Sequence, residues 1–205
     1  MRREISPVAE EVPLSIGLAF DGVLEAARGG APWAFERLWV ELSSAVAGYL
    51  RCQGTAEPDD LTSEVFLGVF AGLKSFTGSE EKFRSWVFTI AHHRLVDERR
   101  RTVRRYWSTT ADLSILDQVG GDAEADALDV LGNQRAAELG NQRAAEFCAG
   151  LSADQRDVLL LRVVGDLTVE QVAKILGKTV GGVKVTQRRA LSALRKSIER
   201  EGVPL

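Results

Sequence analysis

The residues best suited to chemistry in this chain are basic side chains near its C-terminal end. Residues 180–200 contain six lysines and arginines and a single acid, Glu199. Ammonium and guanidinium groups bind phosphate oxygens, so a helix of one sign suits the backbone of a nucleic acid. The alternative is a solvated basic face without a ligand. The basic residues are Lys184, Arg188, Arg189, Arg195, Lys196 and Arg200.

A second basic cluster lies in the middle of the chain, next to aromatic residues. Five arginines and no acid occur between Arg99 and Arg105, and Phe83 and Trp86 precede them. Arginines can follow phosphates while bases stack on aromatic rings, which is the chemistry of single-stranded DNA binding. For Trp86 taken alone, packing in a hydrophobic core is the preferred interpretation.

The adjacent histidines His92 and His93 suggest a different chemistry, because with Asp97 and Glu98 they could form the metal site of a nuclease. Neighbouring side chains on a helix point about 100° apart, and no further ligand cluster accompanies them. GxSxG, Walker and HExxH motifs are absent. We therefore expect no catalytic residue, metal or cofactor, and keep a nuclease as the enzymatic alternative.

A helix-turn-helix at residues 168–196 is predicted to position the C-terminal basic residues. Thr168 and Gln171 form a capping box, which predicts that a helix begins there. Gly177 predicts a left-handed helix end, and Lys178–Thr179 a tight turn. A basic second helix held across a supporting helix is the geometry that enters a DNA major groove. The residues predicted to face inward on this second helix are Val183, Ala190, Leu191, Leu194 and Ile198.

Helical periodicity also dominates the rest of the chain, and strand patterns are weak. Helices are predicted over residues 18–27, from Pro32 to about residue 50, and over residues 59–74. A helix carrying Phe83 and Trp86 follows, and its apolar phase breaks near residues 91–94, which predicts a loop or kink. Ser152 and Gln155 form another capping box, which predicts a helix packed under the helix-turn-helix and ended by Gly165, with Val163 among its apolar positions.

The chain is therefore predicted to be all-α, with two small helical domains joined by a linker. The predicted divisions are a lead at residues 1–17, a domain at 18–107, a linker at 108–150 and a helix-turn-helix domain at 151–205. The net charge of −3 conceals an acidic linker between two basic zones. The linker contains the octapeptide LGNQRAAE twice in tandem, at 131–146. Two basic zones indicate two contacts with nucleic acid.

The helix predicted at residues 59–74 has an unusual outward face. Its apolar residues cover one side, while Leu67 lies on the other side among Asp60 and Glu64. An apolar anchor rimmed by carboxylates is typical of a docking site for a partner. Single exposed leucines are also common in proteins. The residues alone leave both interpretations open.

Cysteine usage and hydropathy indicate the compartment. Cys52 and Cys148 are far apart and lack a CxxC context, so they do not indicate a disulfide framework. A reducing compartment is expected, with a redox switch kept as an alternative. The N-terminus has no apolar segment, and the longest apolar run, residues 65–73, is too short to span a bilayer. We therefore expect a cytoplasmic protein.

Two segments resemble the bacterial RNA polymerase sigma factors of the sigma-70 family. Residues 151–196, LSADQRDVLLLRVVGDLTVEQVAKILGKTVGGVKVTQRRALSALRK, resemble the promoter-binding domain of its short extracytoplasmic function (ECF) group. Residues 59–101, from DDLTSEVF to VDERRR, resemble the other conserved domain. The GGVKVTQRRAL and LTSE sequences are similar to the actinomycete BldN-type subgroup.

The resemblance implies a factor that docks on core RNA polymerase, directs it to promoters and holds DNA open while the polymerase does the chemistry. Implied partners are the β′ clamp helices and β flap of the core enzyme, promoter DNA and an anti-sigma factor. The alternative within binding proteins is a stand-alone helix-turn-helix regulator. The residues implied in core docking are Asp59, Asp60, Glu64 and Leu67.

The resemblance also assigns DNA contacts, with a flipped −10 base held by the loop expected after Trp86. The family often has Asn at the position of His93, Ser at that of Val185 and Arg at that of Thr186, so base preference is not transferred. The residues implied at the −10 element are Phe76, Trp86, His92, His93, Arg94, Arg99, Arg100 and Arg101. The residues implied at the −35 element are Lys178, Thr179, Lys184, Val185, Arg188 and Arg189.

Overall fold

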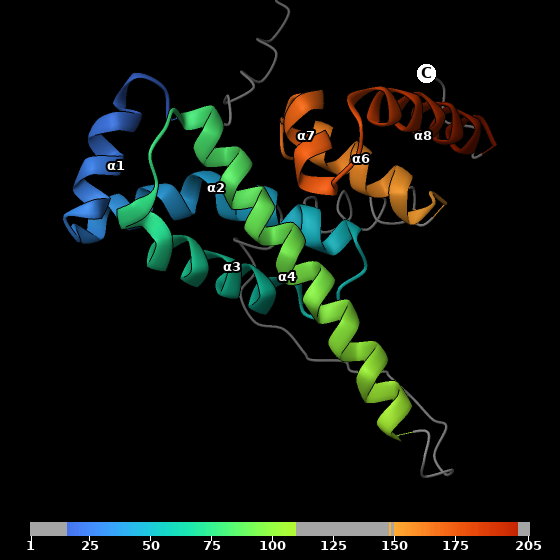
Figure 1. Cartoon of the computed structure of the whole chain (residues 1–205), viewed down its shortest axis with the longest axis horizontal. Helices are drawn as coiled ribbons and strands as arrows, with labels where there is room; N and C mark the ends of the chain where they lie inside the picture. The colour runs from blue at the N-terminus through green and yellow to red at the C-terminus, as the bar shows by residue number, and fades with distance from the viewer. Residues whose placement is uncertain (1–15, 110–147, 149, 201–205) are drawn as a thin grey trace, which may run out of the picture.

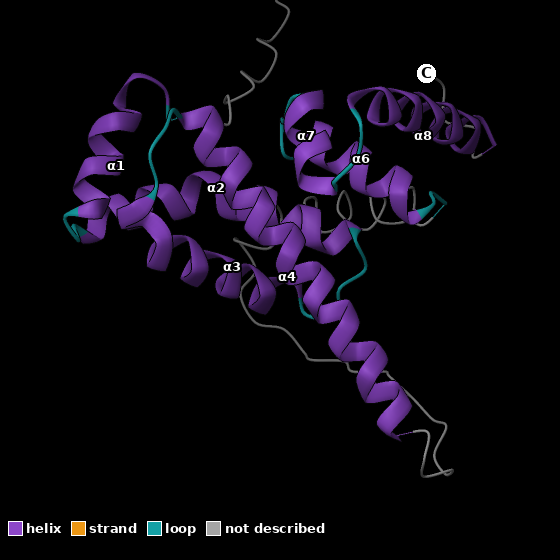
Figure 2. Ribbon diagram, viewed as in Figure 1, coloured by secondary structure: helices purple, strands orange, loops and turns teal. Residues whose placement is uncertain are grey.

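The structure is a computed structural model that describes residues 16–109, 148 and 150–200. Every regular element within these ranges is helical, as Figure 2 shows. The prediction of an all-α protein is confirmed. Most of the predicted lead and most of the predicted linker lie outside the described residues. The repeated octapeptide and the acidic residues of the linker are in that part of the chain.

The N-terminal domain packs its helices around α2, α3 and α4. Prolines occupy the first position of α2 and of α3, where the missing N–H costs no helical hydrogen bond. Aromatic rings fill the core, with Tyr49 edge-on to Phe88 and Phe66 beside Trp39. The elements are η1 (Gly17–Ala19), α1 (Phe20–Arg28), α2 (Pro32–Cys52), α3 (Pro58–Gly72), η2 (Leu73–Ser75) and α4 (Glu80–Thr109).

Helix α4 is continuous over 30 residues, about 45 Å. The loop or kink predicted near residues 91–94 is therefore wrong. Val87, Ala91 and Leu95 recur at four-residue spacing and are all fully buried, so the apolar stripe passes through this stretch with a small residue in the middle. The irregular segment lies before the helix instead, at residues 76–79. Figure 1 shows the C-terminal half of α4 extending beyond α2 and α3.

The C-terminal domain begins its first two helices as the sequence predicts. Ser152 and Gln155 form a reciprocal capping box, and so do Thr168 and Gln171. Gly177 ends α7 in the left-handed conformation, with φ 62°. Val183 and Ala190 are buried as expected. The elements are α6 (Ala153–Val163), α7 (Val169–Leu176) and α8 (Val180–Arg200).

Two apolar positions of this domain differ from the prediction. Leu191 is 49% exposed and Val163 is 66% exposed, although both were expected to face inward. On α8 the inner surface is taken by Ala190, and Leu191 is turned about 100° from it. Val163 is the last residue of α6.

The Gly177 turn gives a stability prediction. Gly177→Ala is expected to destabilise the protein by about 1–2 kcal/mol, because a side chain disfavours the left-handed conformation. Space is not the cause, since no atom lies within 4 Å of the added Cβ. Gly181→Ala, in a helix and equally open, is expected to stabilise by about 0.5–1 kcal/mol. Urea denaturation measures the free energy of unfolding of both variants. Equal changes in the two variants would contradict the left-handed conformation assigned to Gly177.

The two domains pack against each other. Helix α6 contacts α2, and α7 contacts α4 (Figure 1). Val158, Leu161 and Val172 of the C-terminal domain belong to the same buried cluster as Tyr49 and Phe88 of the N-terminal domain. The hydrophobic core thus continues across the two domains, which the sequence pattern did not predict.

Candidate nucleic-acid and polymerase interfaces

The outward face of α8 carries four of the residues assigned to the −35 element. Lys184, Val185, Arg188 and Arg189 are exposed and line the same open hollow. They are placed there because Val183 and Ala190 point into the domain, which turns the intervening positions outward. The helix therefore presents three cations with one apolar side chain between them, a surface suited to the phosphates and base edges of a duplex.

The two turn residues assigned to the −35 element make internal contacts. The Lys178 ammonium lies 2.7 Å from a carboxylate oxygen of Asp154 on α6. The hydroxyl of Thr179 accepts a hydrogen bond from the backbone N–H of Gly182, at 3.1 Å. Thr179 therefore satisfies a free N–H in the first turn of α8, as capping residues do. These contacts join the turn to α6 through Lys178 and to the first turn of α8 through Thr179.

The aromatic residues assigned to the −10 element lie at the start of α4. The rings of Phe76 and Trp86 stack with centroids 5.0 Å apart, and Phe83 meets Phe76 edge-on at 5.3 Å. Gly72 makes room for the indole, since a Cβ there would lie 2.9 Å from Trp86. Phe76 and Trp86 are half-buried, so each ring keeps one part in the core and one part at the surface.

His92 and Arg99 point from α4 toward α2. His92 Nδ1 shares a hydrogen bond with the Tyr49 hydroxyl at 3.0 Å, and burial lowers the pKa of His92, so its imidazole is neutral at pH 7. Burial likewise raises the pKa of the Tyr49 hydroxyl. Arg99 donates to the side-chain oxygen of Gln53 at 2.8 Å and to its backbone carbonyl at 3.3 Å.

The other basic residues assigned to the −10 element are more open. His93, Arg100 and Arg101 are exposed, and Arg94 is half-buried. The two exposed arginines each pair with an acid of their own helix, at 3.8 and 3.9 Å, which are weak surface contacts. The structure thus separates the assigned residues into an aromatic end, a pair facing α2 and an exposed arginine face.

The outward face of α3 carries the residues assigned to core docking. Asp59, Asp60 and Glu64 are exposed, and Leu67 is 69% exposed among them. A hydrogen bond from the protonated Glu57 carboxyl to Asp60, together with the Asp60 charge, raises the pKa of Glu57, so acidic groups crowd the start of this helix. Four carboxylates therefore precede one apolar anchor, and sequence reasoning missed Glu57.

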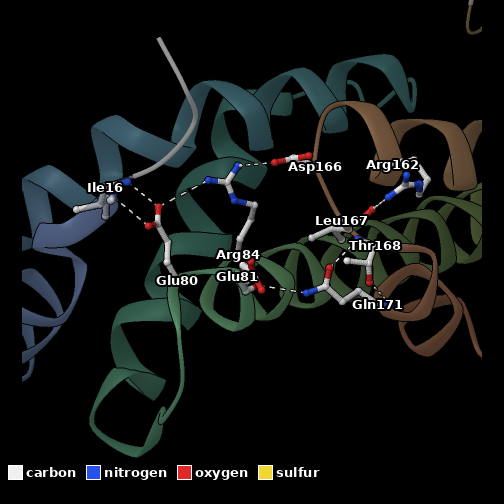
Figure 3. A network of polar contacts seen from close by, with 10 residues as sticks. Ile16, Glu80, Glu81, Arg84, Arg162, Asp166, Leu167, Thr168 and Gln171 are labelled. Atoms are coloured by element: carbon white, nitrogen blue, oxygen red, sulfur yellow. Dashed lines mark hydrogen bonds and ion pairs between the residues drawn. The ribbon is translucent and has the colours of Figure 1, made fainter. Parts of the chain in front are cut away.

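Polar contacts between the domains were not predicted. The Gln53 amide donates to Asp157 of α6 at 2.6 Å. Buried Arg84 lies 3.7 Å from Glu80 on its own helix and 3.9 Å from Asp166, before α7 (Figure 3). No signal in the sequence pairs residues so far apart in the chain. We call these contacts, with the shared core, the domain seam.

Within residues 16–109, 148 and 150–200, no group of three or more His, Cys, Asp or Glu side chains could hold a metal ion. No helix of the described chain is long and apolar enough to cross a membrane.

Comparisons with known proteins follow the same division of the chain. The family model for sigma-70 region 2 matches residues 35–105, and that for sigma-70 region 4 matches residues 143–194. The ECF RNA polymerase sigma factor BldN of Streptomyces coelicolor is 31% identical over 176 residues, 85% of this chain and 64% of BldN. ShbA of Streptomyces griseus, also an ECF sigma factor, is 33% identical over 143 residues, 69% of this chain and 71% of ShbA.

A solved structure shows the same fold. The sigma factor RpoE in complex with the anti-sigma factor NepR, from Bartonella quintana, matches with a TM-score of 0.56 at 22% identity, over 80% of this chain and 96% of that chain. The relatives and the two family models indicate the same family, and the helix-turn-helix geometry is consistent with it. The chain belongs to the ECF subfamily of the sigma-70 family of bacterial RNA polymerase sigma factors and is similar to its BldN-type members.

Proposed function

We propose that the three surfaces described above divide the work of a sigma factor. The outward face of α3 docks on the β′ clamp helices of core polymerase, α4 engages and holds open the −10 element, and α8 enters the major groove at the −35 element. The protein itself catalyses no step and acts in the cytoplasm, where the polymerase works.

The exposed basic face of α8, presented by a capped helix-turn-helix, carries this proposal. Arginine and lysine contacts with phosphates provide affinity that does not depend on sequence. Arg188 and Arg189 can pair with guanine edges, and the Val185 side chain can contact a thymine methyl group. The stacked rings of Phe76 and Trp86 provide an apolar surface for an unstacked base.

Partner recognition favours a sigma factor over a stand-alone regulator. A regulator that binds duplex DNA by α8 has no need for an outward leucine among four carboxylates. The RpoE structure contains a bound anti-sigma factor. A protein inhibitor of this chain is accordingly part of the proposal.

Run-off transcription tests the proposal. Core polymerase with the purified chain is expected to initiate at a small set of promoters in a genomic library, and core polymerase alone is expected to initiate at none of them. Pull-down of core polymerase separates the alternatives. A chain that binds promoter DNA and does not retain core polymerase would support a stand-alone regulator.

A further inference from the structure

The two cysteines, 96 positions apart in sequence, meet at the domain seam. Cys52 is in the last turn of α2, and Cys148 lies just before the C-terminal domain. Their thiols hydrogen-bond each other. Cys148 is only 5% exposed and belongs to the buried cluster, and half-buried Cys52 packs against that cluster.

Neighbouring residues hold the two thiols together. Gln53 follows Cys52 directly and donates to Asp157 of α6. Arg156 precedes Asp157 and donates from Nε to the Cys148 carbonyl at 2.9 Å. The residue after Cys52 and the carbonyl of Cys148 are therefore both held by the same turn of α6, so the proximity of the cysteines has support beyond the thiols.

One thiol of the pair is activated. The hydrogen bond from Cys148 lowers the pKa of Cys52 to about 7, with help from the nearby Arg51 and Arg156 guanidinium groups. The same hydrogen bond and burial raise the pKa of Cys148. A half-exposed thiolate beside a buried resolving thiol is the arrangement that oxidants convert to a disulfide.

We propose that Cys52 and Cys148 form a disulfide under hydrogen peroxide and that this bond locks the two domains together. The Cys52 thiolate attacks one peroxide oxygen, the O–O bond breaks, and the departing hydroxide takes up a proton to give water and a sulfenic acid. The Cys148 sulfur then attacks the sulfenic sulfur, and its proton leaves with the hydroxyl group as a second water. Two thiols and one peroxide thus give one disulfide and two waters.

Promoter geometry explains why the lock would inactivate the factor. The −35 and −10 elements are separated by about 25 base pairs, or about 85 Å at about 3.4 Å per pair. The chain between residues 109 and 148 can extend to about 130 Å, which is enough for α8 and α4 to separate. A disulfide at Cys148 removes this reach, because the C-terminal domain begins only a few residues later and is pinned to the end of α2.

The experiment treats the full-length protein with hydrogen peroxide, maps the disulfide by mass spectrometry of non-reduced peptides, and measures run-off transcription with core polymerase. We expect a Cys52–Cys148 peptide in the wild type. We expect transcription to fall to about a tenth or less, since only the unlinked fraction stays competent, and to recover with dithiothreitol. Cys52→Ser and Cys148→Ala are expected to transcribe normally before and after peroxide.

Failure of the disulfide proposal can be distinguished from failure of the proposed sigma-factor function. Disulfides only between molecules, or a linked protein that transcribes as well as the reduced one, would overturn the lock. The loss of activity rests on the sigma-factor function proposed above. An inactive reduced protein would contradict that function, whereas peptide mapping would still decide whether the disulfide forms. If either cysteine variant unfolds, the other serves as the control.

Discussion

Leu67→Arg is expected to weaken binding to core polymerase about 30- to 1000-fold. An apolar anchor at the centre of an interface is worth about 2–4 kcal/mol, and a cation placed there must also be desolvated. The fold should tolerate the change, because Leu67 is 69% exposed and contributes little to the core. The measurement is the dissociation constant for core polymerase, with thermal unfolding measured in parallel.

Val163→Arg is the matched control for this substitution. Val163 has a similar exposure, 66%, but lies on α6 in the other domain. Its replacement is expected to leave the affinity for core polymerase within about twofold, as for surface positions generally. Equal losses in both variants would show that charge alone, and not the α3 face, controls binding.

Arg189→Ala is expected to reduce transcription from a promoter with a −35 element about 5- to 150-fold. That range corresponds to the loss of about 1–3 kcal/mol from one arginine paired with a base. Binding to core polymerase should persist, because Arg189 lies on α8 and the proposed docking face lies on α3. Run-off yield and core affinity are measured on the same preparation.

Arg195→Ala provides the comparison on the same helix. Arg195 is exposed but lies nearly two turns beyond Arg189, outside the hollow lined by the assigned residues. A smaller effect that is uniform across promoter sequences is expected there, as for a phosphate contact. If Arg189→Ala abolished core binding, its assignment to the −35 element would be wrong.

Local features of the fold could be predicted from the sequence. Both capping boxes, the proline start of α2 and the left-handed Gly177 depend on residues within one turn of each other. The outward position of Leu67 also follows from helical period alone. The physical causes of these features are local, so the sequence displays them directly.

The remaining features depend on contacts between distant residues. The loop or kink predicted at residues 91–94 was based on Arg94. That prediction overlooked Ala91, whose small side chain keeps the apolar stripe of α4 buried. The Gln53–Asp157 hydrogen bond joins positions 104 residues apart, and no pattern within either helix indicates it. Arg99 and His92 were assigned to DNA by their charge and neighbours, whereas in this structure His92 contacts Tyr49 of α2 and Arg99 contacts Gln53, the residue after α2.

The amide of Gln171 serves two partners at once. Its oxygen accepts the Thr168 N–H at 2.7 Å, while its nitrogen donates to the Glu81 carbonyl of α4 at 3.4 Å. Departure from α4 would sacrifice only the longer and weaker of these bonds, and water can replace it. The capping box that starts α7 is therefore complete within the C-terminal domain and does not depend on the contact with α4.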